Sequence, residues 1–341
     1  MTWSSRRALR VTISLVIIAA LFVFARDVDW RSVGVAARGA DPLLLAGAIT
    51  LNLLSLLLKG VRWWLFLRPI GARSFALAIR ATFAGAALNN VLVAQGGEGA
   101  RVLLVARGAN VSSAKVLAAL AIERTLDAVT YLVLLVGAAW FLPLPHAIAR
   151  WSWAASIALV VVLAALGVLA CRRPLPNVRP ADASGDAGSR PATASRAGAG
   201  TALIRRIRRY ASRFASSATA VAGPGRLASA LLLSIGAWVL QIATYDFVAR
   251  AAGLPLPLAG SVAALIAIGV SFLVRATPGN VGIFQLVYVV TVRSFGVAEA
   301  PAVAVALLIQ AIQVIPTLLA GAIAAPALLR RNDRVAISDK R

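Results

Sequence analysis

Long uninterrupted apolar runs constrain this chain more than any other feature of its sequence. They recur along most of its 341 residues, of which 60% are hydrophobic and only 14% charged. The runs are rich in Leu, Ala, Val and Ile and lack the alternation of barrel strands, so helices must satisfy the backbone hydrogen bonds in lipid. We therefore predict an all-α fold, a polytopic membrane helix bundle of about eight helices.

Seven segments are predicted as helical spans, and two further apolar segments are interrupted. The spans are Ala8–Ala25, Asp41–Leu58, Val116–Trp140, Trp151–Cys171, Arg226–Ala249, Leu256–Val274 and the longer Ala298–Leu329. Pro316 and Pro326 are expected to kink or end the last of these. Gly-rich stretches break the segments 75–105 and 275–295. Arginine placement requires segment 75–105 to enter and leave on one face or to cross twice, and we favour a re-entrant hairpin.

The formal net charge of +23 raises the question of nucleic-acid binding. Most arginines, however, lie at the ends of apolar runs or in one loop, which is the distribution that the positive-inside rule produces. We therefore predict no nucleic-acid partner. The same rule places both termini on the cytoplasmic side, and we predict that the membrane is a bacterial inner membrane. The basic residues also favour anionic lipid head groups.

The basic cytoplasmic segment 172–225 divides the chain into two membrane halves, 1–171 and 226–341. Its first part, Pro174–Gly200, is rich in Ala, Ser, Gly, Pro and Arg, and we predict a disordered linker. The following Ala202–Ala218 is either an interfacial helix or a solvated connector. Each half carries one interrupted segment, and such breaks in corresponding places point to a transporter binding site. They suggest a pseudo-repeat, although the identity between the halves is too low to establish one.

The inventory of reactive side chains is small. Cys171 and His146 are the single residues of their types, which excludes a disulfide framework and a His/Cys site for zinc or haem. Metal binding by carboxylates alone is not excluded. No Walker motif or nucleophile constellation is present, so we predict no cofactor, no resident metal and no catalytic residue.

The first polar constellation interrupts segment 75–105. It runs from Gly96 and Gly97 through Glu98 to Arg101, and Asn90 precedes it. Glycines before a helical run leave backbone N–H groups free to face an anion, and an arginine fork suits phosphate. Glu98 and Arg101 are three residues apart, so they share a helix face. The alternative is an ordinary interfacial turn with a local ion pair.

The second constellation is Glu123, Arg124 and Asp127, inside the predicted span Val116–Trp140. One charge at the bilayer centre costs roughly 2.5–3.5 kcal/mol on insertion scales. We expect these three to face a polar cavity, where Arg124 neutralises the acids. The alternative is that the span begins later and that the three side chains snorkel to the inner interface.

The third constellation opens segment 275–295 with Pro278, Gly279 and Gly282, followed by Gln285. Proline suits the first turn of a helix and glycine allows close helix approach, so we predict a second half-helix directed at the midplane. Two further polar sets lie in apolar runs: Gln310 with Gln313, and Asp246 with Tyr245 and Gln241. Each is interpreted either as cavity lining or as helix–helix hydrogen bonds, and the second interpretation is preferred for the glutamines.

The stretch Lys59-Gly60-Val61-Arg62-Trp63-Trp64 ends the second predicted span. Paired tryptophans beside cations are typical of an interfacial anchor. We favour that role for Arg62 over contact with substrate.

These four motifs, in this order between about residues 40 and 330, resemble the flippase-like family that includes the transmembrane region of lysylphosphatidylglycerol synthases. The resemblance implies a bundle with re-entrant elements that moves a lipid between leaflets, and family members are also associated with hopanoid and other surface-lipid pathways. Two departures matter. The family pattern often has an acid where this chain has Gln285, and few residues follow the last predicted span, so the soluble aminoacyl-transfer domain is not expected.

The leading hypothesis is an integral membrane translocator for a phospholipid, a glycolipid or another polar-headed lipid. The alternatives are a membrane-embedded enzyme, with Glu98 or Asp127 as general base, and an accessory subunit of a lipid-modification pathway. The partners are membrane lipids with anionic or glycosylated head groups. The predicted substrate-binding residues are Asn90, Gly96, Gly97, Glu98, Arg101, Glu123, Arg124, Asp127, Pro278, Gly279, Gly282 and Gln285.

Overall fold

The computed structural model describes residues 31, 35, 38–91, 96–142, 152–171, 221, 223–271 and 280–338. The predicted span Ala8–Ala25 and the linker predictions for residues 174–218 lie outside this part of the chain. Within it, the backbone forms nine α-helices and one short 3₁₀ helix, without a strand. The all-α prediction is confirmed.

The elements follow the predicted segments closely. They are α3 (Pro42–Leu67), η1 (Arg68–Ile70), α4 (Phe75–Val91), α5 (Gly96–Gly108), α6 (Ser113–Phe141), α8 (Ser152–Cys171), α10 (Pro224–Ala251), α11 (Leu258–Ser271), α12 (Ile283–Arg293) and α13 (Glu299–Ser338). Three helical stretches are long and apolar enough to cross a membrane, Pro42–Ile70, Pro224–Ala251 and Glu299–Ala324. Shorter apolar helices accompany them, as expected of a multi-pass protein.

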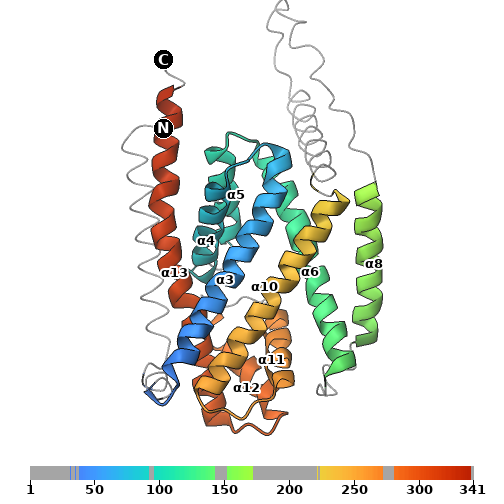
Figure 1. Cartoon of the computed structure of the whole chain (residues 1–341), viewed down its shortest axis with the longest axis vertical. Coiled ribbons are helices and arrows are strands. Elements are labelled where there is room, and N and C mark those ends of the chain that lie inside the picture. Colours follow the sequence, from blue (N-terminus) through green and yellow to red (C-terminus); the bar gives the residue numbers. More distant parts are fainter. Residues whose placement is uncertain are drawn as a thin grey trace, which may run out of the picture.

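Helices α3 and α10 pack side by side in opposite directions (Figure 1). The Asp41 carboxylate caps α3 by accepting the backbone N–H of Leu43 at 2.8 Å, as cap residues do for the unsatisfied first turn. Asp41 N–H in turn donates to the carbonyl of Ala251 at 3.0 Å, at the last residue of α10. Further along, the Ser55 hydroxyl donates to the Ala237 carbonyl at 2.8 Å. These contacts fix the antiparallel register of the pair.

Helix α13 differs from the prediction at its prolines. The helix was expected to kink or end at Pro316 or Pro326, but it continues through both to Ser338, so the predicted ends are wrong. Proline removes one backbone donor, and neighbouring packed helices can compensate for that loss. Such packing exists here, because a Cβ placed on Gly321 would lie 2.3 Å from the Ala87 Cβ of α4.

The interrupted segment 75–105 forms the helical hairpin α4–α5. A second hairpin, α11–α12, combines the predicted span Leu256–Val274 with the interrupted segment 275–295. Figure 1 shows the first beside the upper half of α3 and the second at the lower end of α10. Their helices have 17, 13, 14 and 11 residues, each shorter than the roughly 20 residues that span a bilayer. The broken elements of the predicted fold are therefore present. The same-face entry of segment 75–105 stays a prediction.

The buried apolar residues form two large clusters. One is centred on Trp63, Phe66 and Val105 and lies mostly in helices α3 to α6. The other is centred on Tyr288 and Ile309 and lies mostly in helices α10 to α13. Each half of the chain thus contributes most of one core. The domain boundaries themselves stay a prediction, because most of residues 172–225 lies outside the described chain.

Candidate functional site

The centre of the candidate site is the carboxylate of Glu123 on α6, whose side chain is 2% exposed. Its Oε1 accepts a hydrogen bond from Arg62 Nη2 of α3 at 3.0 Å. Its Oε2 pairs with Arg101 Nη2 of α5. Two buried guanidinium groups therefore share one carboxylate. Buried charges persist only when they are paired in this way.

Arg62 connects three helices. Besides Glu123 it pairs with Asp127 at 2.5 Å, and it donates to the Ser234 hydroxyl of α10 at 2.6 Å. Its side chain is 3% exposed, and it lies within the candidate span Pro42–Ile70. The interpretation of Arg62 as an interfacial anchor is therefore wrong, since its charge is enclosed by partners from α6 and α10.

Trp63 is also inside the bundle instead of at its surface. It is fully buried, and the guanidinium carbon of Arg101 lies 3.8 Å from its ring centroid. A cation over an indole face is the strongest arrangement of this kind. Trp64 differs, because its indole N–H donates to the Arg73 carbonyl at 2.9 Å near the end of α3. The paired tryptophans thus have separate roles.

Arg124 forms the outer layer of the site. It pairs with Glu98 of α5 at 2.7 Å and with Asp127, one turn along α6, at 3.1 Å. Its side chain is 45% exposed, and exposed ion pairs contribute little stability. The site therefore has a buried centre around Glu123 and an accessible rim around Arg124.

A close contact between α4 and α5 positions Arg101 and Glu98. A Cβ on Gly97 would lie 2.2 Å from the Gly85 carbonyl oxygen and 2.6 Å from the Asn89 backbone nitrogen. Only glycine allows this approach, which brings the first turn of α5 against α4. Gly99, two residues later, has open space at the same position. The glycines of this motif therefore differ in role.

The remaining predicted residues lie elsewhere. Gln285 caps α12, with its Oε1 accepting the Gly282 N–H at 2.6 Å, and its Nε2 donates to Gln310 Oε1 of α13. Gly282 has φ +87°, a conformation that favours glycine. Asn90 and Gly96 are half-buried on either side of the α4–α5 connection. Pro278 and Gly279 lie outside the described residues.

Sequence reasoning assigned Lys59 and Arg62 to an interfacial anchor instead of the site, and it missed Ser234. Lys59 and Arg62 are three residues apart and share a face of α3, and the Lys59 ammonium lies 5.7 Å from the Trp238 ring centroid of α10. The sequence did indicate that a further cation was needed, because the first two motifs contain three acids but only two arginines. Nothing in the sequence, however, showed which distant cation completes the set.

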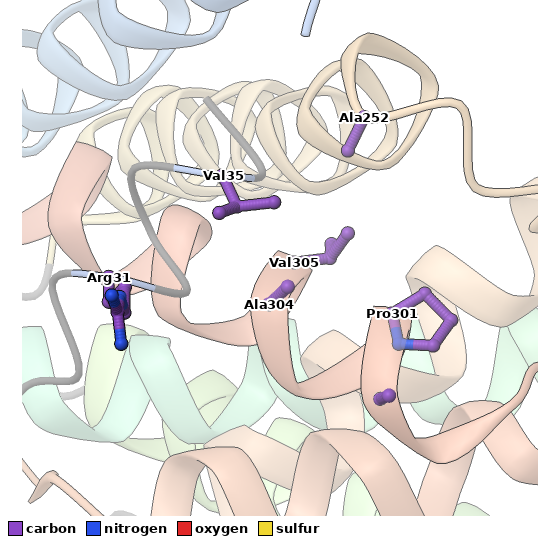
Figure 2. A pocket seen from close by; sticks show the side chains of 7 residues that line it. Arg31, Val35, Ala252, Pro301, Ala304 and Val305 are labelled. Atoms are coloured by element: carbon purple, nitrogen blue, oxygen red, sulfur yellow. The ribbon is translucent and has the colours of Figure 1, made fainter. Parts of the chain in front are cut away.

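A pocket of about 440 Å³ lies away from these residues, by the first turns of α13. Figure 2 shows it between Arg31, Val35 and the α13 residues Pro301, Ala304 and Val305. Apart from Arg31 its lining is apolar, and none of the predicted site residues contributes to it. Within the described chain, no group of three His, Cys, Asp or Glu side chains could hold a metal ion.

The family model described as the lysylphosphatidylglycerol synthase TM region matches residues 11–321. The chain belongs to this family. A search of the curated proteins found no match.

The family places the chain among multi-pass membrane proteins of lipid-related function. In this lysylphosphatidylglycerol synthase TM region, the described residues show no catalytic motif. Instead, the three acids at the site each pair with an arginine.

Proposed function

We propose that this protein moves a polar-headed lipid with a phosphate or other anionic group between the leaflets of a bacterial inner membrane, with both termini cytoplasmic. The cluster of charges around Glu123 carries the proposal. Charges inside a membrane bundle are costly and rare, and among other functions they mark the pathways of substrates and ions. Family membership supports a lipid-related role.

The charge balance of the cluster favours an anionic substrate. Four cations, Lys59, Arg62, Arg101 and Arg124, lie beside three acids, Glu98, Glu123 and Asp127. Among the described residues, Lys59 makes no ion pair or hydrogen bond of its own. One positive charge is thus left to balance a phosphate, while the acyl chains remain in the bilayer.

The helical hairpins support a path for the head group. The first turn of α5, which carries Glu98, begins directly after the connection from α4, so the rim of the site lies near the hairpin tip. Interrupted helices that place such tips at mid-membrane are the usual construction of transporter sites. A membrane-embedded enzyme is less well supported, because its general base would have to be one of the paired acids.

Replacing Lys59 tests the anionic preference. We expect Lys59→Met to slow the leaflet exchange of fluorescent phosphatidylglycerol in proteoliposomes by about tenfold, the effect of losing one charge-assisted contact of roughly 1.5 kcal/mol. Exchange of a zwitterionic lipid with the same label should change less. The measurement is the rate at which dithionite quenches the label.

Lys115→Met is the matched control, because Lys115 is exposed near the start of α6. It should leave both rates at the wild-type value. Equal rates for the Lys59 and Lys115 variants would remove Lys59 from the binding of the head group.

A further inference from the structure

The helices α10 to α13 follow one another in the same order as α3 to α6, but the second set has the opposite orientation in the bundle. Each set consists of a long helix, a two-helix hairpin and a second long helix. The first members, α3 and α10, are antiparallel, and the hairpins lie toward opposite ends of that pair (Figure 1). This is the arrangement of an inverted-topology repeat, in which each half can open toward one side of the membrane.

A neutral polar cluster occupies the place in the second set that the charged cluster occupies in the first. Gln285 on α12 bonds to Gln310 on α13, as Arg101 on α5 pairs with Glu123 on α6. A residue of α10 also joins the cluster, because Tyr245 shares a side-chain hydrogen bond with Gln313 of α13. The pattern of helices is the same, but amides and phenols replace the ions.

This neutral cluster has hydrogen-bonding capacity that the described residues do not use. The Tyr288 side chain is fully buried, and its hydroxyl has no hydrogen-bond partner among them. Its ring lies 6.5 Å from that of Tyr245, centroid to centroid. Asn280, 2% exposed at the start of the same hairpin arm, also has an unpaired Oδ1. A buried hydroxyl or amide without a partner is costly, so these atoms indicate a missing ligand.

We propose that the cluster of Tyr245, Gln285, Tyr288 and Gln310 is a second station for the lipid, which binds uncharged hydroxyl groups of the head group. The inference rests on the proposed function and deepens it. It assigns the substrate to phosphate lipids that carry a polyol, such as glycerol or a sugar, beyond the phosphate. The charged cluster contacts the phosphate, and the neutral cluster contacts the polyol after the opposite half has opened.

The chemistry of the neutral cluster fits hydroxyl groups better than a second phosphate. Amide and phenol side chains both donate and accept, as a polyol requires. Asp246 directly follows Tyr245 in α10 and pairs with Arg250 at 2.7 Å. Asp246 is 6% exposed and its Oδ1 has no partner, so a carboxylate faces the interior beside Tyr245 and would repel an anion.

Two lipids of equal charge distinguish binding by the neutral cluster from binding by the charged cluster. Phosphatidylglycerol carries two free hydroxyls beyond the phosphate, whereas phosphatidylethanol carries none. Sites built to bond a hydroxyl discriminate strongly against the analogue that lacks it. We expect wild-type protein in proteoliposomes to exchange labelled phosphatidylglycerol faster than labelled phosphatidylethanol by about tenfold, the effect of one or two hydrogen bonds.

The variants Tyr288→Phe and Gln310→Met should each reduce that preference toward one. Tyr131→Phe is the matched control, because it removes a hydroxyl that bonds the Ile266 carbonyl outside the cluster, and it should keep the wild-type preference. A wild-type preference of one, or an unchanged preference in both cluster variants, overturns the second station while leaving translocation intact. Wild-type protein that moves neither lipid overturns the proposed function, and the second station with it.

Discussion

Glu123→Gln should lower the free energy of unfolding by about 3–5 kcal/mol, the cost of removing one partner from a buried ion pair. The substitution keeps the size of the side chain but removes the charge that Arg62 and Arg101 share. Arg62 retains Asp127 and Ser234. Arg101 retains the Trp63 ring alone among these contacts, and a buried guanidinium without a carboxylate is the main source of the loss.

An unfolding titration with SDS in mixed detergent micelles measures this difference. Glu299→Gln is the matched control, since Glu299 pairs with Arg293 at 3.2 Å but is 66% exposed, and exposed pairs contribute at most about 1 kcal/mol. The double variant Glu123→Gln with Arg101→Met should recover part of the stability, because it removes the orphaned charge. A Glu123 variant as stable as the Glu299 variant would contradict the buried cluster.

The second large effect is expected at Gly97. Gly97→Ala should destabilise the protein by about 1–3 kcal/mol, the usual cost of overpacking, and should also abolish lipid exchange. The new Cβ would meet the Gly85 carbonyl and the Asn89 backbone nitrogen, which are backbone atoms and cannot rotate away. Helix α5 must then move from α4, and Arg101 moves with it away from Glu123.

Gly99→Ala makes the same change two residues along the same helix. No atom lies within 4 Å of the new Cβ, and alanine is favoured over glycine in a helix by up to about 1 kcal/mol. The two substitutions should therefore shift stability in opposite directions. Unfolding titrations and exchange assays on both variants provide the comparison, and equal effects would refute the close packing of α4 on α5.

Most of the fold could be predicted from apolar runs alone. Helices α3, α6, α8, α10 and α11 fall within a few residues of the predicted spans, except that α3 continues to Leu67. That extension could not be foreseen, because Lys59 and Arg62 look like the end of a span in sequence. Their buried partners in α6 and α10 become visible only in three dimensions. The continuation of α13 through Pro316 likewise depends on packing against other helices.

The candidate site was predictable only in part. Glu123, Arg124 and Asp127 are close in sequence, and their mutual contact followed from helical spacing. The pairing of Arg101 with Glu123 joins residues that the sequence placed in two separate motifs, and Arg62 lies further away still. Long-range contacts of this kind depend on how helices are arranged, which apolar periodicity does not specify. The hydrogen bond from Gln285 to Gln310 joins α12 to α13. A helix–helix hydrogen bond was the interpretation preferred for Gln310 from the sequence.

The central claim is that the charged cluster moves a lipid head group between leaflets. The most direct measurement is dithionite quenching of labelled phosphatidylglycerol in vesicles that contain wild-type protein, Arg101→Ala protein or no protein. The account predicts that wild-type vesicles lose the protected inner-leaflet fluorescence, whereas Arg101→Ala vesicles retain it as protein-free vesicles do. Equal quenching with wild-type and Arg101→Ala protein, or retained fluorescence with the wild type, would contradict it.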